Sequence, residues 1–362
     1  MTERKSVSVI VTGLISDPVI FSKSLINFSS ISQITEIWLV TWETEAEKNS
    51  IILSQWAHHY NLKVAAIPEP DKWSGNLLSQ MVALYIGLGR TNTNNYVLKT
   101  RTDVYLEPEA LLYVFNKDLS IDLPNNFANV RTPFDEKVCV WGVEATVPFY
   151  IHDLFFFGSH NDISKLVNMD IRYDVLYKMS KEKIHIRRFL HPFIHEYPIF
   201  EKFLHIEHVL GNTEEFPNEY RIQVLEKLLK DDMYILVLSL YYKVVGCFFS
   251  NDWGINNVFI WRDVPQQISF QEGMSLSKLL LSNRNLKALI LRGDDLFHGI
   301  LNRTYATCPI GKRFDKALDY LDGLKDIREA GLENDFDGFI FRSLEAGEQV
   351  IQKLKQNPEN IK

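Results

Sequence analysis

Two cations and a carboxylate fall within five residues of one β-type segment, at Lys99, Arg101 and Asp103. The residues just before them, 96–98, are aromatic or apolar, and side chains along a strand alternate between its two faces. The pattern predicts a strand over 96–105 whose last charged side chains share one face. At the end of such a strand an Asp can hold a divalent metal ion, and an Arg can bind phosphate oxygens through two hydrogen bonds.

Three further positions have residue types that suit ligand binding. Asn76 and Gln80 are four residues apart, which places both amides on one face of the helix expected over 73–88. Gly13 follows the first expected strand, where the absence of a side chain lets a ligand approach the backbone. A solvated helix face and an ordinary turn glycine are the alternative interpretations.

Asp153 lies inside an apolar and aromatic run over 149–158. Apolar surroundings raise the pKa of a carboxyl group and make it a better general base. His152 is a second candidate for the same role, and a structural or helix-capping Asp is the alternative. The later histidines lack the His-Glu-x-x-His spacing, so we predict no zinc site.

The elements that must position these residues alternate between strand and helix. Strands are expected over 7–12, 35–41, 62–67 and 96–105, and helices over 18–29, 45–60 and 73–88. Short connections predict right-handed crossovers and a mostly parallel sheet with helices on both faces. Ligands bind at the carboxyl ends of the strands in such α/β sheets, which is where the charged cluster falls.

The rest of the chain is less regular. We expect a helix over 107–115, short strands near 138–141 and 258–261, and mainly helical structure from 162 to about 230. We divide the chain into a main domain over 1–240 and a mixed, mainly helical C-terminal extension over 241–362.

Composition narrows the class of protein. Hydrophobic residues make up 46% and aromatic residues 12%, which excludes a disordered chain. The net charge of −7 includes no basic excess, so we expect no nucleic-acid partner. Three widely spaced cysteines and the lack of a signal-peptide pattern predict a cytoplasmic protein. The apolar run over 234–249 is too short to span a bilayer, and peripheral contact with the inner face of the inner membrane stays an alternative.

Three motifs together resemble the WavE lipopolysaccharide-synthesis family of bacterial glycosyltransferase-like proteins. They are Asn76-x-x-x-Gln80, the stretch 97–103 and the stretch 152–158, and the similarity spans about 7–211. The resemblance implies a GT-A-like, Rossmann-like fold that takes a nucleotide-sugar donor. It also implies an oligosaccharide or lipid-linked acceptor that belongs to a bacterial lipopolysaccharide or capsule.

The resemblance also implies roles for single residues. Asp103 stands where GT-A enzymes place the last acid of an Asp-x-Asp motif, which binds Mn²⁺ or Mg²⁺ against the donor diphosphate. Arg101 replaces the first acid, so Lys99 and Arg101 are expected to supply part of the positive charge. Asp153 would be the base of an inverting transfer.

The remaining implied contacts concern the nucleotide, since Gly13, Asn76 and Gln80 would lie against the nucleotide or its ribose.

Two other functions stay open. A nucleotidyltransferase has a similar α/β half, but usually a Gly-rich loop with Lys or Arg after the first strand, and 12–16 contains no cation. A non-catalytic glycan-binding protein of the same fold is the second alternative.

Overall fold

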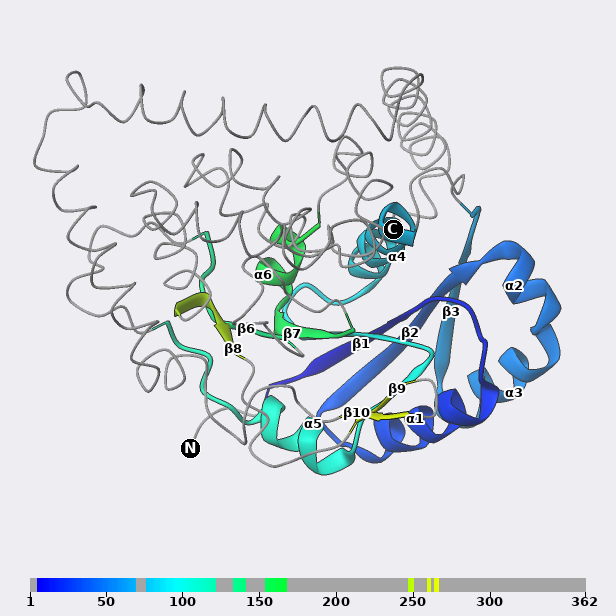
Figure 1. Ribbon diagram of the computed structural model, residues 1–362, viewed down its shortest axis with the longest axis horizontal. Helices are drawn as coiled ribbons and strands as arrows, with labels where there is room; N and C mark the ends of the chain where they lie inside the picture. Colours follow the sequence, from blue (N-terminus) through cyan, green and yellow to red (C-terminus); the bar gives the residue numbers. More distant parts are fainter. Residues whose placement is uncertain are drawn as a thin grey trace, which may run out of the picture.

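A mixed sheet of seven strands forms the centre of the molecule. The computed structural model describes residues 5–69, 76–121, 133–140, 154–167, 247–250, 259–261 and 264–266. The strands are β1 (Val7–Thr12), β2 (Ile34–Trp42), β3 (Leu62–Ile67), β4 (Tyr96–Arg101), β6 (Val138–Val140), β7 (Phe156–Ser159) and β8 (Phe249–Ser250). Their order in the sheet is β3-β2-β1-β4-β7-β6-β8 (Figure 1).

The pairing is mostly parallel. Strands β3, β2, β1 and β4 run parallel, β7 is antiparallel to β4 and to β6, and β8 is parallel to β6. All six residues of β1 are buried, as expected of a central strand that helices cover on both sides. The prediction of an α/β fold with a mostly parallel sheet and flanking helices is confirmed.

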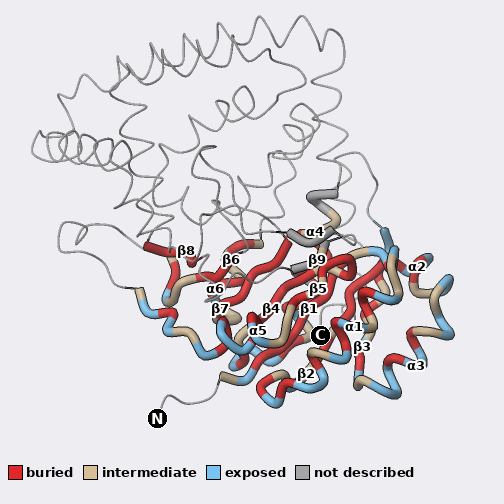
Figure 2. Tube along the Cα trace, turned by 60° about the horizontal axis from the view of Figure 1, so that its bottom comes forward, coloured by how far each residue is buried: buried red, intermediate tan, exposed pale blue. Residues whose placement is uncertain are grey.

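Helices α1 (Pro18–Ser30), α3 (Ser50–Tyr60) and α5 (Pro108–Phe115) lie on one side of the sheet (Figure 1). Helix α1 begins where the side chain of Asp17 accepts hydrogen bonds from the backbone N–H groups of its first turn, with Pro18 at its start. Its Phe21, Leu25 and Phe28 join the main apolar core, which includes the β1 and β4 residues that face α1. Figure 2 shows buried residues along these strands and exposed residues along the outer sides of α2 (Glu43–Lys48) and α3.

Helices α4 (Asn76–Arg90) and α6 (His160–Lys165) cover the other side of the sheet (Figure 1). Gly87 of α4 lies directly on β1, where an added Cβ would be 2.4 Å from Cγ2 of Ile10. A larger residue there would force α4 away from the sheet. Gln80 precedes Gly87 by two helical turns and therefore shares its sheet-facing side.

Two predicted elements are divided in the structure. The helix expected over 45–60 is two helices, α2 and α3, because the Asn49 side chain between them bonds back to the carbonyl of Glu45 at 2.9 Å. The strand expected over 96–105 ends at Arg101, since its parallel partner β1 ends at Thr12. Residues 102–103 form a turn.

After that turn the chain enters a second sheet. Strand β5 (Val104–Tyr105) pairs with β9 (Phe259–Trp261), which pairs with β10 (Val264–Gln266). After residue 167 the structure describes only residues 247–250, 259–261 and 264–266. The domain boundary at 240 and the helical C-terminal extension therefore stay predictions.

Candidate functional site

The candidate site lies at the carboxyl ends of β1 and β4, where Thr12 is the register partner of Arg101. Gly13 follows β1 with a φ of 120°, a backbone conformation that side-chain-bearing residues rarely adopt. The loop that it begins is held from two sides. Its N–H donates to the carbonyl of Val40 at 3.3 Å, and its own carbonyl accepts from Oγ1 of Thr41 at 2.9 Å.

Thr102 holds the same loop from the side of β4. Its backbone N–H donates to the carbonyl of Thr12 at 3.3 Å, and its hydroxyl donates to the carbonyl of Leu14. Thr102 is buried. The turn after β4 and the loop after β1 therefore form one hydrogen-bonded unit.

Glu45 of α2 fixes the next residue of the loop. Its Oε1 accepts a hydrogen bond from the backbone N–H of Ile15 at 3.0 Å and another from the Asn49 side chain at 3.0 Å. The Glu45 residue is only 9% exposed. A buried carboxylate thus lies against the loop that would face a ligand.

Arg101 and Asp103 form a two-point ion pair. Nε of Arg101 donates to Oδ1 of Asp103 at 2.8 Å, and Nη2 donates to Oδ2 at 2.9 Å. The Arg101 side chain is 22% exposed and that of Asp103 is 8% exposed. Sequence alternation predicted that these groups converge, and the structure brings them together through the turn rather than along a continuous strand.

Lys99 lies further inside the same end of β4 and is 1% exposed. Its ammonium is 5.5 Å from the centre of the Phe156 ring, a distance at which a cation is attracted to an aromatic face. Lys99 is the register partner of Ile10, the residue on which α4 packs. The two cations of β4 therefore lie on the α4 side of the sheet.

The structure confirms that Asn76 and Gln80 lie on one helix, with Asn76 as the first residue of α4. The side-chain oxygen of Gln80 is buried and accepts no hydrogen bond from any residue that the structure describes. Such an oxygen suits a ligand donor. The side chain of Asn76 is outside the described part, and the nucleotide-binding role of both residues stays a prediction.

A divalent ion bound to Asp103 does not fit this arrangement. Both carboxylate oxygens already accept hydrogen bonds from Arg101. A dication on Asp103 would also lie close to the Arg101 guanidinium, and like charges repel. Within the described ranges, we also find no group of three or more His, Cys, Asp or Glu side chains that could hold a metal.

The predicted base, Asp153, and its neighbour His152 lie outside the described residues. The base assignment therefore stays a prediction. Sequence reasoning missed Thr41, Glu45 and Thr102, which hold the loop after β1. Of these, only Thr102 carried a signal, because it lies inside the charged motif itself.

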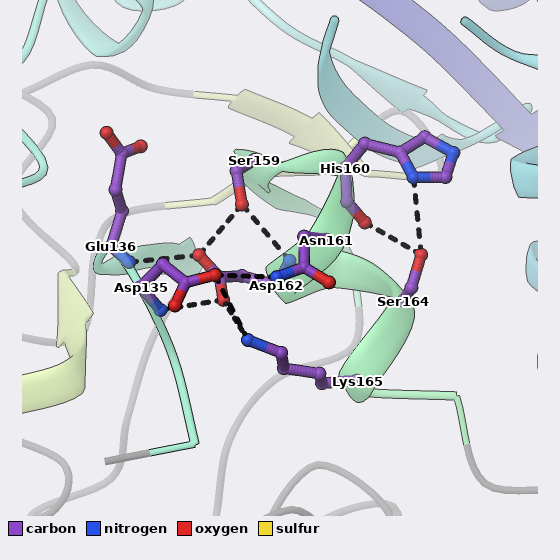
Figure 3. A network of polar contacts seen from close by, with 8 residues as sticks. All are labelled: Asp135, Glu136, Ser159, His160, Asn161, Asp162, Ser164 and Lys165. Carbon is purple, nitrogen blue, oxygen red and sulfur yellow. Dashed lines mark hydrogen bonds and ion pairs between the residues drawn. The ribbon is translucent and has the colours of Figure 1, made fainter. Parts of the chain in front are cut away.

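A second polar cluster, shown in Figure 3, surrounds Asp162 of α6. It contains His160 and Ser164, but their contacts do not form a nucleophilic triad. The Ser164 hydroxyl donates to the carbonyl of His160 at 2.7 Å and lies 3.4 Å from Nδ1 of the same ring (Figure 3). Nε2 of His160 lies 3.1 Å from the carbonyl of Leu88, so no carboxylate contacts the other ring nitrogen among the described residues. The His160 ring thus joins α6 to α4, and we assign this cluster a structural role.

Comparisons with known proteins give no family and no sequence relative. No protein-family model matches the chain, and no curated protein matches it in sequence. The comparisons therefore do not support the specific resemblance to the WavE family.

Solved structures that resemble the chain include nucleotidyl- and glycosyltransferases. The 4-diphosphocytidyl-2C-methyl-D-erythritol synthase of Anaerococcus prevotii is 16% identical, with a TM-score of 0.27, over 42% of this chain and 64% of its own. The glycosyltransferase GlyE of Streptococcus pneumoniae is 11% identical, with a TM-score of 0.31, over 53% of this chain and 43% of its own.

The mannosyltransferase PcManGT of Pyrobaculum calidifontis, in complex with GDP-Man and Mn²⁺, is 11% identical, with a TM-score of 0.33, over 85% of this chain and 89% of its own. At such TM-scores the likeness carries no argument about this site, which rests on its own geometry. Within the described part of the chain, no helix has the length and apolar character needed to cross a membrane.

Proposed function

We propose that this chain is a glycosyltransferase that binds a nucleotide-activated sugar at the carboxyl ends of β1 and β4. The observation that carries the proposal is the Arg101 guanidinium at the end of β4, beside the glycine turn that ends β1. A guanidinium suits phosphate oxygens because it offers parallel hydrogen bonds in one plane. Gly13 lets a nucleoside come close to the backbone. The diphosphate would thus bind at Arg101, and the nucleoside would bind next to it at Gly13.

The loop after β1 favours glycosyl transfer over nucleotidyl transfer. A loop that cradles phosphate directs its backbone N–H groups at the ligand. Here the N–H of Gly13 donates to Val40, and that of Ile15 donates to the carboxylate of Glu45. The Glu45 carboxylate would also repel phosphate. We therefore assign the loop to the nucleoside or sugar and the diphosphate to Arg101, with the charge of Lys99 behind it.

The proposed reaction is a direct displacement. An acceptor hydroxyl oxygen forms a bond to the anomeric carbon, and the bond from that carbon to the diphosphate breaks with its electron pair. The nucleoside diphosphate leaves, the anomeric configuration inverts, and the hydroxyl proton passes to a general base, for which Asp153 is the predicted residue. Because Arg101 engages both oxygens of Asp103, the proposal uses no metal ion.

The proposed acceptor is a bacterial surface glycan, of lipopolysaccharide or capsule type, as the motif resemblance implies. Asn76 and Gln80 are proposed to contact the nucleotide from α4. The buried oxygen of Gln80 supports this role, since a ribose hydroxyl could donate to it.

A screen of donor binding and donor breakdown tests the proposal. UDP-, GDP-, ADP- and dTDP-sugars are titrated calorimetrically, and release of free nucleotide from each is measured. A donor at 100 times its Kd would stabilise the protein by about 2.7 kcal/mol. Arg101→Gln should weaken binding at least about tenfold, equivalent to 1.4 kcal/mol.

Lys63→Gln is the matched control, because it removes a cation from the ion pair with Glu36 at the start of β3. Donor affinity should be unchanged in that variant. Pyrophosphate release from a nucleoside triphosphate and a sugar phosphate would instead establish nucleotidyl transfer. Binding of none of these nucleotides would refute the proposal.

A further inference from the structure

Gly87 lets α4 lie directly against β1, and Gln80 lies on the same side of the helix two turns earlier. On the premise of the proposed function, we propose that Gly87 is a positioning residue for Gln80. The missing side chain sets the distance between α4 and β1, and that distance brings the Gln80 oxygen within reach of a ribose hydroxyl. The site therefore prefers a ribonucleotide, although Gly87 itself does not touch it.

The contact at Gly87 leaves no room for a side chain. A Cβ at this position would overlap Cγ2 of Ile10 and lie 3.1 Å from its Cδ1. Ile10 is fully buried in the middle of β1, and a β-branched side chain has few rotamers to choose from. An alanine at position 87 would therefore displace α4 rather than Ile10.

Glycine is also an unfavourable residue at this point of the chain. Gly87 lies inside α4, where glycine destabilises a helix relative to alanine. Helix α4 packs on β1 and β2 (Figure 1). The close approach to β1 is thus the feature of the fold that requires glycine here.

Helix and strand geometry place Gln80 at the ligand-binding end of the sheet. Helix α4 joins two parallel strands, β3 and β4, so it runs back from their carboxyl ends to their amino ends. At roughly 1.5 Å per residue, Gln80 lies about 10 Å nearer the carboxyl ends than Gly87. The same distance along β1 is about three residues, which leads from Ile10 to Gly13. Gln80 is therefore level with the glycine turn.

The Gln80 side chain offers an acceptor at that level. Its oxygen is buried and accepts no hydrogen bond from any residue in the described ranges. A buried acceptor without a donor is unfavourable, and a ribose hydroxyl can supply the donor. Because such a bond is lost when the two oxygens are a few tenths of an ångström too far apart, a small displacement of α4 would break it.

Calorimetric titration of the full chain tests the inference with UDP, GDP, CDP and ADP and with the 2′,3′-dideoxy form of each. The nucleotide that binds should lose about three- to tenfold in affinity without its ribose hydroxyls, the equivalent of one hydrogen bond. Gly87→Ala should weaken the ribonucleotide by that factor and change the dideoxy form by less than about twofold. A purely structural defect would weaken both forms alike.

A second substitution tests whether the contact with β1 is the cause. Ile10→Ala removes the atoms that a Cβ at position 87 would meet, so adding it to Gly87→Ala should restore the preference for the ribonucleotide. Gly158→Ala is the matched control, because an added Cβ there would lie 3.4 Å from its nearest neighbours, an ordinary contact distance. Its affinities for both forms should equal those of the unmodified chain.

Gln80→Leu removes the acceptor while Gly87 and Ile10 stay in place, so it decides the case if Gly87→Ala does not fold. It should abolish the preference for the ribonucleotide. A preference that persists in Gln80→Leu or in folded Gly87→Ala would overturn the inference, as would equal binding of the two forms by the unmodified chain. Binding of none of the diphosphates in either form would overturn the proposed function as well.

Discussion

Asp162 and Asp103 are buried carboxylates near opposite ends of β4, and their hydrogen-bond donors differ in kind. Asp162 is fully buried and accepts from the backbone N–H groups of Asp135 and Glu136, each at 2.9 Å. It also accepts from the Ser159 hydroxyl at 2.8 Å and from Lys165 at 3.0 Å (Figure 3). Ser159 is the register partner of Tyr96, the first residue of β4.

Asp103 instead accepts two hydrogen bonds from one flexible side chain, that of Arg101. Backbone donors cannot leave without unfolding the segment that carries them, whereas a guanidinium can adjust toward a ligand. We therefore expect substitutions at the start of β4 to affect stability, and substitutions at its end to affect the proposed binding. An ion pair between a carboxylate and a cation therefore does not by itself indicate a functional site.

Other polar groups at the start of β4 fit the same division. The Tyr96 hydroxyl donates to Glu136 at 2.9 Å, and burial, helped by that carboxylate, raises the pKa of Tyr96 well above its usual range. Lys5 lies 4.6 Å from the centre of the Tyr96 ring and donates to the carbonyl of Lys117 at 2.7 Å. Burial lowers the pKa of Lys5, although Glu136 opposes the shift. These contacts pack the amino-terminal end of β4, a central strand of the sheet.

The largest expected effect comes from Asp162→Ala. The substitution leaves two backbone N–H groups and Lys165 without their buried acceptor, so we expect a loss of about 3–5 kcal/mol in the free energy of unfolding. Urea denaturation followed by circular dichroism measures it. Asp103→Ala should shift the urea midpoint far less, and equal shifts would remove the distinction between the two ends of β4.

The second prediction concerns Glu36, near the start of β2. Burial alone would raise the pKa of this carboxyl. Hydrogen bonds from Ser8, Asn92, Trp38 and Lys63 lower the pKa by more than burial raises it, so the pKa of Glu36 is below its ordinary value. The contribution of the ionised Glu36 to the free energy of unfolding is therefore complete above the unfolded-state pKa of about 4.3. It is lost as the pH falls through the lower pKa of the folded state.

Glu36→Gln measures that contribution. We expect a loss of about 1.5 kcal/mol at pH 7, at the low end for hydrogen bonds to a charged group because Lys63 is 43% exposed. The difference between the two proteins should shrink between pH 5 and pH 3, which urea midpoints at several pH values would show. A difference that stays constant with pH would contradict the assignment.

The smallest expected effect comes from Thr102→Val at the binding end. Loss of the hydroxyl leaves the Leu14 carbonyl without this donor, so we expect about 1 kcal/mol of destabilisation. Because the loop after β1 is then less fixed, nucleotide affinity should fall by up to about fivefold, the ratio equivalent to 1 kcal/mol. Thr102→Ser keeps the hydroxyl and is the control. Equal affinities for the Val and Ser variants in calorimetry would show that this bond does not order the site.

Local patterns in the sequence predicted the sheet well. The strands expected over 7–12 and 62–67 have the observed bounds, and the helix expected over 18–29 ends one residue later, at Ser30. These elements follow from apolar periodicity, and α1 also from the Asp-Pro pair at its start. The break at residues 102–103 was missed, because the end of β4 depends on where its partner β1 ends.

The sequence by itself determined where β1 ends, and that Gly13, Lys99 and Arg101 lie toward the carboxyl ends of β1 and β4, where ligands bind in α/β sheets. It also determined that Asn76 and Gln80 share a helix. Backbone geometry repeats over a few residues, so these features can be inferred from neighbours in the chain.

Only the tertiary structure decided which groups bond to one another. Glu45 lies in a charged segment typical of a solvated helix, yet its carboxylate holds Ile15, thirty residues earlier, at 3.0 Å. Thr102 likewise reaches Leu14, and the turn after β4 lets Asp103 bond to Arg101 through both oxygens. These contacts join residues that are far apart in the sequence and meet only when the strands and helices pack together. The periodicity of neighbouring residues therefore cannot predict them.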